Sequence, residues 1–331
     1  MRALVYTGPQ AIEFQEAPEP TPGASEVLIQ VEAVGICGSD MHTYLGHDAR
    51  RPPPLILGHE ASGRALTGRY QGRRVVVNPL VSCGTCDFCL GGRANVCRTR
   101  QIISIPPRQG AFAEQIAVPE RNVLPVPEGV SAAAAALTEP IATSLHAIDV
   151  AERALWRPLG EARQVLVLGG GAIGLAAALI LRARGVREVW VGDTNPKRRQ
   201  TVERAGAFRV YDPAAETPPE DAFALVVDAV GGRRTREAGS AAVMPGGVLV
   251  HIGLMDADDG LDIRKFTLQE VAFIGTYTYT MVDFRATLDA IHAGQLGALD
   301  WIEQRALEEG PAAFRDLLDG RTSAAKVILT P

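Results

Sequence analysis

Cysteine is scarce in this sequence, with 5 residues among 331, and the number is odd. So few cysteines do not make the disulfide framework of a small secreted protein. A chain of this length also buries enough apolar surface to fold without disulfides. In a reducing compartment, cysteines that cluster in a sequence more often bind a metal or take part in catalysis.

Long apolar runs and long basic runs are also missing. The longest apolar stretches, near Ala132–Leu137 and Val165–Ala183, carry glycine, alanine or charge. Neither is an uninterrupted run of about 20 strongly apolar residues, so we expect no membrane span. A formal net charge of −5 without a basic run leaves no electrostatic footprint for DNA or RNA. The first residues, MRALVYTGPQ, do not resemble a signal peptide, which predicts a cytoplasmic protein.

The composition is that of an ordinary globular protein, with 47% hydrophobic and 21% charged residues, and the length predicts about two domains. Short strands broken by proline and glycine dominate the first 140 residues, which predicts a β-rich domain. We expect strands at 1–6, 26–35, 74–79 and 111–119, and a helix beginning near Ser131, a good N-cap residue.

The pattern changes near Val165, where near-continuous apolar strands begin to alternate with helical segments. This alternation is typical of a parallel sheet. Strands are expected at 165–169, 188–193, 208–212, 224–231, 247–253 and 271–277, with helices after the first two. The short, proline-rich link 213–223 does not favour a full crossover helix. Amphipathic helices at 281–294 and 311–320 and a last strand at 324–331 are expected to return to the first domain.

Four of the five cysteines form one cluster with the spacing C-x2-C-x2-C-x7-C: Cys83, Cys86, Cys89 and Cys97. Four thiolates within fifteen residues can surround one zinc ion tetrahedrally. All four ligands then come from the protein, so the site is predicted to be structural rather than catalytic. An iron–sulfur cluster is disfavoured, because its fourth cysteine usually comes sooner and precedes proline.

The fifth cysteine, Cys37, lies in GICGSDMH, and His59 and Glu60 lie downstream in GHEASG. A cysteine and a histidine 22 residues apart do not by themselves define a metal site. The surrounding glycines mark loops at strand ends, however, and the nearby carboxylates of Asp40 and Glu60 fit ligands or partners of ligands.

A dinucleotide motif follows the apolar strand at 165–169, with Gly169, Gly171 and Gly174 in the order G-x-G-x-x-G. The motif opens a helix, and Asp193 stands nineteen residues after Gly174 at the end of a second strand, which is the required context. The helix N-terminus would bind the phosphates. Asp193 would accept hydrogen bonds from the ribose, which favours NAD over NADP; Lys197 and Arg198 weaken that preference.

Taken together, the chain resembles the zinc-dependent medium-chain dehydrogenase/reductase family. GICGSDMH, GHEASG, the four-cysteine segment, TEPIATSLHA and GGGAIG occur in the family's order over essentially the whole chain. The resemblance implies an α/β protein with a β-rich GroES-like catalytic domain and a Rossmann doubly wound parallel-sheet NAD domain. The expected division is 1–142 for the catalytic domain, with its zinc lobe at 80–100, 143–280 for the NAD domain, and 281–331 for the return to the catalytic domain.

The resemblance also implies roles for individual residues. Cys37 and His59 match ligands of a catalytic zinc, and either Glu60 or Glu139 must serve as the third protein ligand, because no cysteine remains for it. Further matches concern proton transfer and the cofactor: Ser39 and His42 match a proton relay, Asp40 a partner of the zinc-bound histidine, Thr143 a contact on the nicotinamide side and Arg198 a residue beside the adenine. The expected cofactors are two Zn²⁺ ions per chain and NAD.

The carboxylate ligand resembles that of the polyol (sorbitol-type) and threonine dehydrogenases. The substrate is therefore expected to be a secondary alcohol: a polyol, a sugar acid or a sugar-phosphate alcohol. Sorbitol itself is in doubt, because Thr43 and the pair Thr276 and Tyr277 replace residues expected of sorbitol dehydrogenases. L-Threonine 3-dehydrogenase, a simple alcohol dehydrogenase and a non-catalytic NAD- and zinc-binding sensor are the alternatives.

Two further expectations concern partners. The family usually forms homodimers or homotetramers, and the segment VAFIGTYTYT is either an edge strand at such an interface or an ordinary buried strand. Three arginines on loops of the first domain, Arg50, Arg51 and Arg108, either bind an anionic part of the substrate or form a solvated surface.

Overall fold

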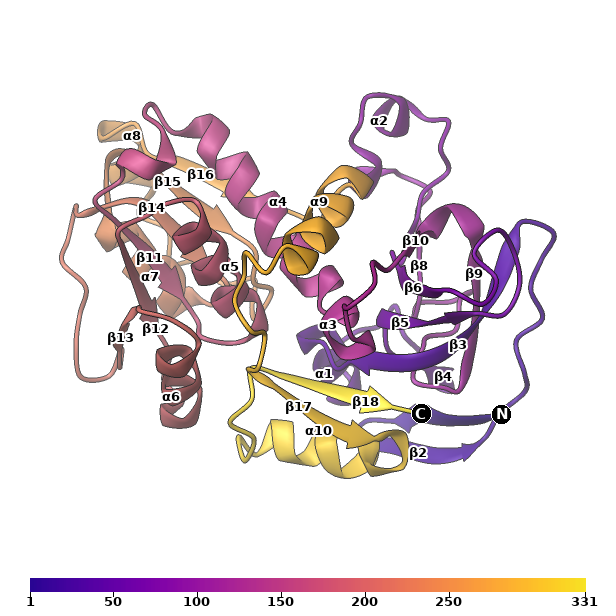
Figure 1. The fold of residues 1–331 in the computed structure, drawn as a ribbon. Helices are drawn as coiled ribbons and strands as arrows, with labels where there is room; N and C mark the ends of the chain where they lie inside the picture. The colour runs from indigo at the N-terminus through magenta and orange to yellow at the C-terminus, as the bar shows by residue number, and fades with distance from the viewer.

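Two lobes lie side by side in the computed structural model, which describes residues 1–331 (Figure 1). Both chain termini lie on the same lobe, which is built from the first part of the chain and its last strands (Figure 1). The strands of this lobe are β1 (Arg2–Gly8), β2 (Ala11–Glu16), β3 (Glu26–Gly35), β4 (Leu55–Ile56), β5 (Glu60–Ala65), β6 (Arg74–Val77), β7 (Leu80–Val81), β8 (Gln101–Ile102), β9 (Gln115–Pro119), β10 (Val123–Pro125), β17 (Ile302–Ala306) and β18 (Lys326–Thr330). Its helices are α1 (Gly38–Tyr44), α2 (Asp87–Leu90), α3 (Ala132–Ala136) and α10 (Gly310–Leu318), with short 3₁₀ turns η1 (Ala94–Val96), η2 (Glu120–Asn122) and η4 (Leu307–Glu309).

The first lobe is organised around a seven-stranded sheet in the order β10-β6-β5-β3-β18-β17, to which β9 adds by pairing with β3. The long strand β3 alternates buried and half-buried residues, so one face with Val27, Ile29 and Val31 lies in the core. A three-stranded sheet, β2-β1-β4, and the short pair β7-β8 complete the lobe.

The second lobe holds a six-stranded parallel sheet in the order β13-β12-β11-β14-β15-β16. In chain order this is 3-2-1-4-5-6, the arrangement of a doubly wound dinucleotide-binding sheet, and the direction reverses between β11 and β14. Its strands are β11 (Gln164–Leu168), β12 (Glu188–Gly192), β13 (Arg209–Tyr211), β14 (Phe223–Asp228), β15 (Val243–His251) and β16 (Ala272–Gly275). The helices are α5 (Ala172–Ala183), α6 (Pro196–Ala205), α7 (Arg233–Ala242) and α8 (Ile263–Leu268), with the turn η3 (Leu159–Glu161).

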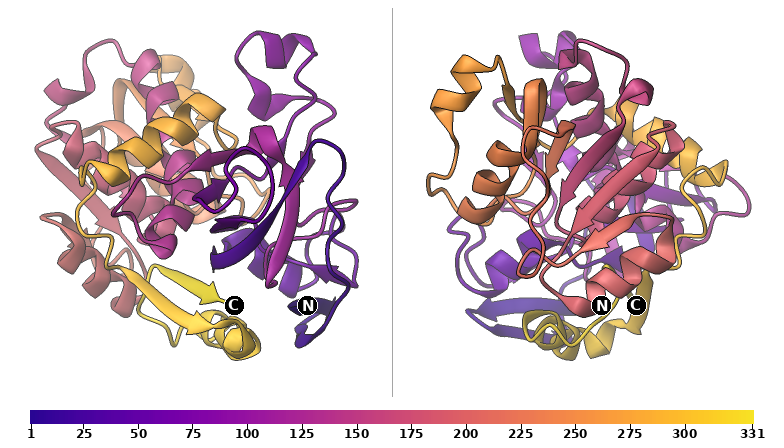
Figure 2. Two further views of the ribbon diagram at one scale, coloured as in Figure 1. Left: turned by 45° about the vertical axis from the view of Figure 1, so that its right-hand side comes forward. Right: turned by 90° about the vertical axis from the view of Figure 1, so that its left-hand side faces the viewer.

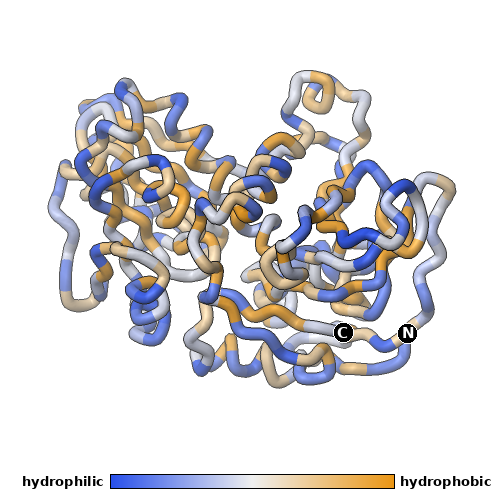
Figure 3. Tube along the Cα trace, viewed as in Figure 1, coloured by the Kyte–Doolittle hydropathy of each residue, from blue (hydrophilic) through white to orange (hydrophobic).

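Burial in the parallel sheet explains its apolar strands. Every residue of β14 is buried, as are four of the five residues of β11. Helices cover both faces of the sheet, as the turned views show (Figure 2), and hydrophobic segments gather in the interior of this lobe (Figure 3). A strand covered on both faces has no polar side to alternate with.

Helices α4 (Thr138–Ala154) and α9 (Met281–His292) pack against each other between the lobes (Figure 1). Helix α4 also contacts strands of both lobes, β5 and β15. It runs without a break past residue 142, the position at which the sequence analysis divides the two domains. No helix of the chain is both long enough and apolar enough to cross a membrane.

Most of the expected elements are present, and a few differ. The helix after Ser131 forms, and the Ser131 hydroxyl accepts a hydrogen bond from the Ala134 amide at 3.2 Å. No helix links β13 to β14, as the proline-rich link predicts. The extended strand expected through Tyr277 is wrong in length, because β16 ends at Gly275 and the chain then turns away; β16 is nevertheless the edge of its sheet. The other strands of the first lobe were not expected from the sequence: β2, β4, β5, β7, β8, β10 and β17.

Candidate active site

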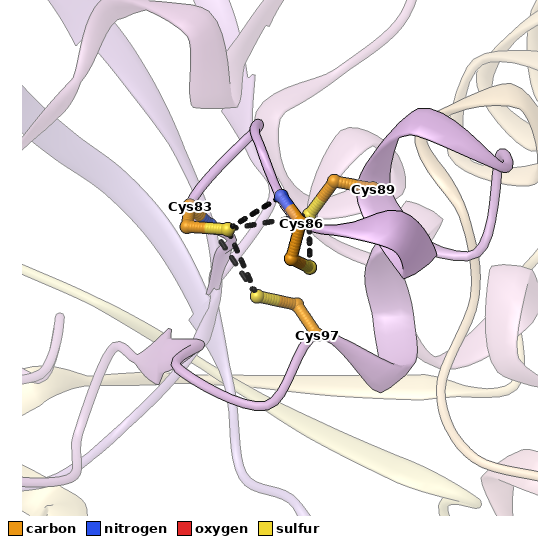
Figure 4. A group of neighbouring side chains, drawn as sticks. All are labelled: Cys83, Cys86, Cys89 and Cys97. Carbon is orange, nitrogen blue, oxygen red and sulfur yellow. Dashed lines mark hydrogen bonds between the residues drawn. The ribbon is translucent and has the colours of Figure 1, made fainter.

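The four clustered cysteines lie together on a projection of the first lobe that carries α2 and η1 (Figures 1 and 4). Their sulfur atoms all lie within 4.8 Å of one another. Three of the sulfur–sulfur distances are 3.5 Å (Cys86 to Cys89), 3.6 Å (Cys97 to Cys83) and 3.8 Å (Cys83 to Cys89). Zinc bonded to four sulfurs at about 2.3 Å in a tetrahedron would separate them by about 3.8 Å, so the four thiols fit a zinc ion.

Backbone amides also point at these sulfurs. The amides of Thr85 and Cys86 donate to the Cys83 sulfur at 3.5 and 3.4 Å, and these bonds lower the pKa of the Cys83 thiol to about 5. Such amides stabilise thiolates, the form of cysteine that binds metal.

The second group of candidate ligands comes from two strand ends of the first lobe. Cys37 follows β3 and is the N-cap of α1, while His59 and Glu60 stand where β5 begins. Antiparallel pairing places Glu60 directly opposite Gly35. The donor atoms of Cys37, His59 and Glu60 all lie within 4.8 Å of one another. Residues 22 positions apart in the sequence thus form one compact set of sulfur, nitrogen and oxygen donors.

Asp40 orients this group. Its carboxylate accepts a hydrogen bond from the Cys37 amide at 3.0 Å and lies 3.6 Å from Nδ1 of His59, an arrangement that leaves Nε2 of the ring for a metal. Burial lowers the pKa of His59, but the negative charges of Asp40 and Cys37 raise it more, and the net direction is well upward. The same negative surroundings favour a bound cation.

Of the two candidate carboxylates, Glu60 lies closer to the donor atoms of Cys37 and His59. One of its two oxygens already accepts a hydrogen bond. Lys326 donates to Oε1 of Glu60 at 2.6 Å, while Oε2 is buried without a hydrogen-bond partner. A Cβ atom on Gly35 would lie 2.0 Å from Oε2, so only glycine leaves room for the carboxylate there. An orphaned carboxylate oxygen beside a thiol and an imidazole fits zinc.

Glu139, on the first turn of α4, lies near this group but outside the compact set. Its Oε1 accepts a hydrogen bond from the hydroxyl of Tyr279 at 2.8 Å. Burial, and to a smaller degree the charge of Glu60, raises the pKa of Glu139 to about 7 against the opposing effects of His59 and Tyr279. The two glutamates are therefore both buried and lie near each other, with Glu60 closer to the donor atoms of Cys37 and His59.

The two expected proton-relay residues lie three positions apart on α1, which places them on one face of the helix. Both Ser39 and His42 are half-buried. The backbone beside them is fixed by the guanidinium of Arg51, which donates to the carbonyl of Ser39 at 3.0 Å and to the hydroxyl of Thr43 at 3.2 Å.

The glycine-rich turn leads from β11 into α5 as expected. Gly169 has φ +100°, a conformation that favours glycine. A Cβ on Gly174 would lie 1.8 Å from the carbonyl oxygen of Gly169, so helix and turn approach each other closely there. A Cβ on Gly171 would meet nothing within 4 Å, so Gly171 borders open space beside the N-terminus of α5. This space is where a pyrophosphate approaches in a dinucleotide site.

Asp193 stands at the end of β12 and points at the same turn. Its carboxylate accepts hydrogen bonds from the amides of Gly170 at 2.8 Å and Asn195 at 2.7 Å. Arg198 is half-buried nearby on the first turn of α6, whereas the amine of Lys197 donates to the carbonyl of Arg321. Thr143, on α4, donates to the carbonyl of Glu139 within its own helix.

Sequence reasoning missed two residues of the metal pocket, Tyr279 and Lys326. The signal for Lys326 was present: it is a single charged residue in the apolar strand AAKVILT. The loop arginines differ from one another. Arg51 is buried and holds backbone, so it is neither a solvated residue nor an anion-binding one. Arg108 pairs with Glu26 at 2.8 Å.

Comparisons with known proteins agree with this geometry. Residues 23–128 match the family described as alcohol dehydrogenase GroES-like domain, and residues 172–293 match zinc-binding dehydrogenase. L-Galactonate-5-dehydrogenase of Escherichia coli K12 is 34% identical over 86% of this chain and 85% of its own length. Sorbitol dehydrogenase of Bacillus subtilis is 29% identical over 100% of this chain and 97% of its own. The structure of acetophenone reductase from Geotrichum candidum in complex with NAD superimposes with a TM-score of 0.89 and 25% identity, covering 100% of this chain and 97% of that one.

The two lobes are thus a GroES-like domain and a Rossmann-type NAD-binding domain. The chain belongs to the zinc-dependent medium-chain dehydrogenase/reductase family, and it is a zinc- and NAD-dependent oxidoreductase. The fold class and the family predicted from the sequence are confirmed.

Proposed function

We propose that this protein oxidises a secondary alcohol of a polyol, sugar acid or sugar-phosphate alcohol by transferring a hydride to NAD. The observation that carries the proposal is the compact set of Cys37, His59 and Glu60 donors, with a buried carboxylate oxygen that lacks a partner. The relatives named for galactonate and sorbitol support this substrate class. L-Threonine and a simple alcohol are the alternative substrates, while membership of the zinc-binding dehydrogenases disfavours the non-catalytic sensor.

In this proposal the catalytic zinc is held by Cys37, His59 and Glu60. The proximity of Glu60 to the other donors favours it over Glu139 as the third ligand. A zinc ion there would supply Lewis acidity that lowers the pKa of a bound hydroxyl. Glu139, held by the hydroxyl of Tyr279, would lie beside these three ligands without being one of them. The four other cysteines, Cys83, Cys86, Cys89 and Cys97, would hold a second, structural zinc.

The protein's own residues would then handle the proton and position the reactants. The hydroxyl of Ser39 would take the proton of the alcohol, and His42, on the same face of α1, would receive it and release it to water. Asp40 would keep the imidazole of His59 oriented. These roles require that α1 stay fixed, which the hydrogen bonds of Arg51 to its backbone provide.

NAD would lie across the carboxyl ends of β11 and β14, where the strand order reverses. Gly169, Gly171 and Gly174 would admit the pyrophosphate to the N-terminus of α5. Asp193 would bind the ribose hydroxyls. Arg198 would lie beside the adenine and Thr143 beside the nicotinamide. NAD would supply the hydride acceptor, while the protein supplies geometry and charge.

The arrangement of domains and subunits is also part of the proposal. We divide the chain into a catalytic domain at 1–142 and 281–331 and an NAD domain at 143–280. The edge strand β16, with Phe273 half-exposed, would pair across a homodimer or homotetramer interface. The five unpaired cysteines favour a cytoplasmic location, because free thiols persist in a reducing compartment.

The variant Cys37→Ser tests the proposed site together with a panel of polyols, aldonates and phosphorylated polyols. We expect the wild-type protein to form NADH with at least one member of the panel. The variant is expected to lose that activity while keeping its fold and its affinity for NADH, because Cys37 does not contact the dinucleotide turn. Unchanged turnover of the variant would refute the metal site.

A further inference from the structure

One short segment of the chain connects three parts of the proposed active site. The amide of Thr276 donates to the carbonyl of His251 at 3.0 Å, at the carboxyl end of the parallel sheet. Asn95, in the four-cysteine projection, donates to the carbonyl of Tyr277 at 2.8 Å. Tyr279 donates to Glu139 at the metal pocket. Tyr277 therefore lies on the segment that runs from the cofactor edge of the sheet to the residues around Glu139.

The guanidinium of Arg100 lies over the ring of Tyr277, with its central carbon 4.7 Å from the ring centroid. One of its terminal nitrogens donates to the carbonyl of Cys97 at 2.8 Å, and its Nε is buried without a hydrogen-bond partner. No carboxylate of the chain forms an ion pair with Arg100, unlike Arg108 beyond β8, which pairs with Glu26. Its charge is thus held in place but not neutralised.

A second arginine of the first lobe, Arg50, stands on the loop between α1 and β4. Arg50 pairs with Asp48 at 2.8 Å, but Arg51 shares that carboxylate at 3.3 Å, so one negative charge faces two positive ones. The hydrogen bond and charge of Asp48 raise the pKa of Arg50 against the opposing effect of burial, and the electrostatic effect of Tyr277 adds a smaller increase. Tyr277 of the second lobe thus contacts the guanidinium of Arg100 and lies within electrostatic range of Arg50.

We propose that Arg100, stacked on Tyr277 and assisted by Arg50, binds an anionic group at the end of the substrate opposite to the hydroxyl that is oxidised. The group is a carboxylate or a phosphate monoester, because the planar fork of a guanidinium matches both. Stacking on an aromatic ring holds the fork in one plane without neutralising it. This anionic anchor rests on the proposed function, and it narrows the substrate class to sugar acids and phosphorylated polyols.

The test compares three substrates of equal chain length: a neutral hexitol, an aldonate and a hexitol phosphate. The measured quantity is the substrate ratio, which is kcat/KM for the preferred anionic substrate divided by kcat/KM for the neutral hexitol. The variant Arg100→Gln is expected to lower this ratio by about ten-fold to a hundred-fold, mainly because KM for the anionic substrate rises. Arg50→Gln is expected to lower the same ratio by a smaller factor, since Asp48 already binds part of its charge. The anionic substrate whose ratio falls more identifies the group.

Arg98→Gln is the matched control, because Arg98 is an exposed arginine on the same segment that lies over the ring of Phe88 instead. Arg98→Gln removes one positive charge, as Arg100→Gln does, but its substrate ratio is expected to stay within about two-fold of the wild-type ratio. Arg100→Lys, which keeps a charge but lacks the fork, is expected to give an intermediate ratio. Zinc content measured on each variant separates loss of the anchor from disruption of the loop at Cys97.

Two results would overturn the inference in distinguishable ways. If the wild type oxidises the alcohols but Arg100→Gln lowers kcat/KM equally for the neutral and the anionic substrates, the anchor is wrong and the proposed function stands. If the wild type binds NADH and two zinc ions but oxidises none of the three substrates, the proposed function fails and the anchor fails with it.

Discussion

Breaking the ion pair between Lys326 and Glu60 tests how the buried group around Cys37, His59 and Glu60 is stabilised. The two side chains meet from opposite ends of the chain, at 2.6 Å, and expose only 4% and 0% of their surface. Lys326 also donates to the carbonyl of Ile36 at 3.0 Å. Replacing it by methionine keeps most of its volume and removes only the charge and these two hydrogen bonds.

The expected cost of Lys326→Met follows from this burial. Removing one partner of a buried pair leaves the other charge unpaired, which costs about 3–5 kcal/mol. Because a zinc ion on the other oxygen of Glu60 would offset part of this, we expect about 3 kcal/mol, a change of more than about a hundred-fold in the ratio of folded to unfolded protein. Urea denaturation followed by tryptophan fluorescence measures the change as a shift of the midpoint, provided that the dependence of the unfolding free energy on urea concentration is the same for both proteins.

Lys265→Met is the matched control. Lys265 forms an equally short ion pair, 2.7 Å from Asp221, but that aspartate is about half-exposed, so we expect a loss of about 1 kcal/mol or less. In Lys326→Met combined with Glu60→Gln, the unpaired charge is gone and part of the lost stability should return, as a coupling of about 1–3 kcal/mol. A Lys326→Met midpoint no lower than that of Lys265→Met, with no such coupling, would refute the reasoning.

Three substitutions separate the roles of the glycine turn and the cysteine cluster. Gly174→Ala should reduce stability, seen as a lower melting temperature, because its Cβ would lie 1.8 Å from the Gly169 carbonyl oxygen; melting at the wild-type temperature would contradict this packing. Gly171→Ala should melt like the wild type but bind NADH at least about ten-fold more weakly in a fluorescence titration, because its methyl group projects into open space; unchanged affinity would place the pyrophosphate elsewhere. Cys97→Ser should lose one zinc per chain by metal analysis and melt at a lower temperature, since a structural zinc is coupled to folding; retention of two zinc ions and wild-type melting would exclude a structural role.

Parts of the site that depend on neighbouring residues could be predicted from the sequence. The four cysteines lie within fifteen residues, so any fold of that loop brings them close, and their spacing alone indicates a metal. The dinucleotide turn is equally local, since Gly169, in the turn after β11, and Gly174, in the first turn of α5, are only a few residues apart in the sequence. The apolar strands of the parallel sheet follow from burial on both faces.

Other parts depend on contacts between distant residues, and there the sequence left alternatives. It offered Glu60 and Glu139 equally, and only the pairing of β5 with β3 brings Glu60 and its neighbour His59 to Cys37. Lys326 contacts Glu60 across 266 residues of sequence, and Tyr279 contacts Glu139 across 140. No local pattern encodes such contacts, because they arise from the order of strands in a sheet and from the packing of one lobe against another. The sequence by itself predicted which residues are candidates for binding metal and dinucleotide, because their spacing is local. The tertiary structure decided which carboxylate lies beside the cysteine and histidine and which charges face it, because strand pairing sets those contacts.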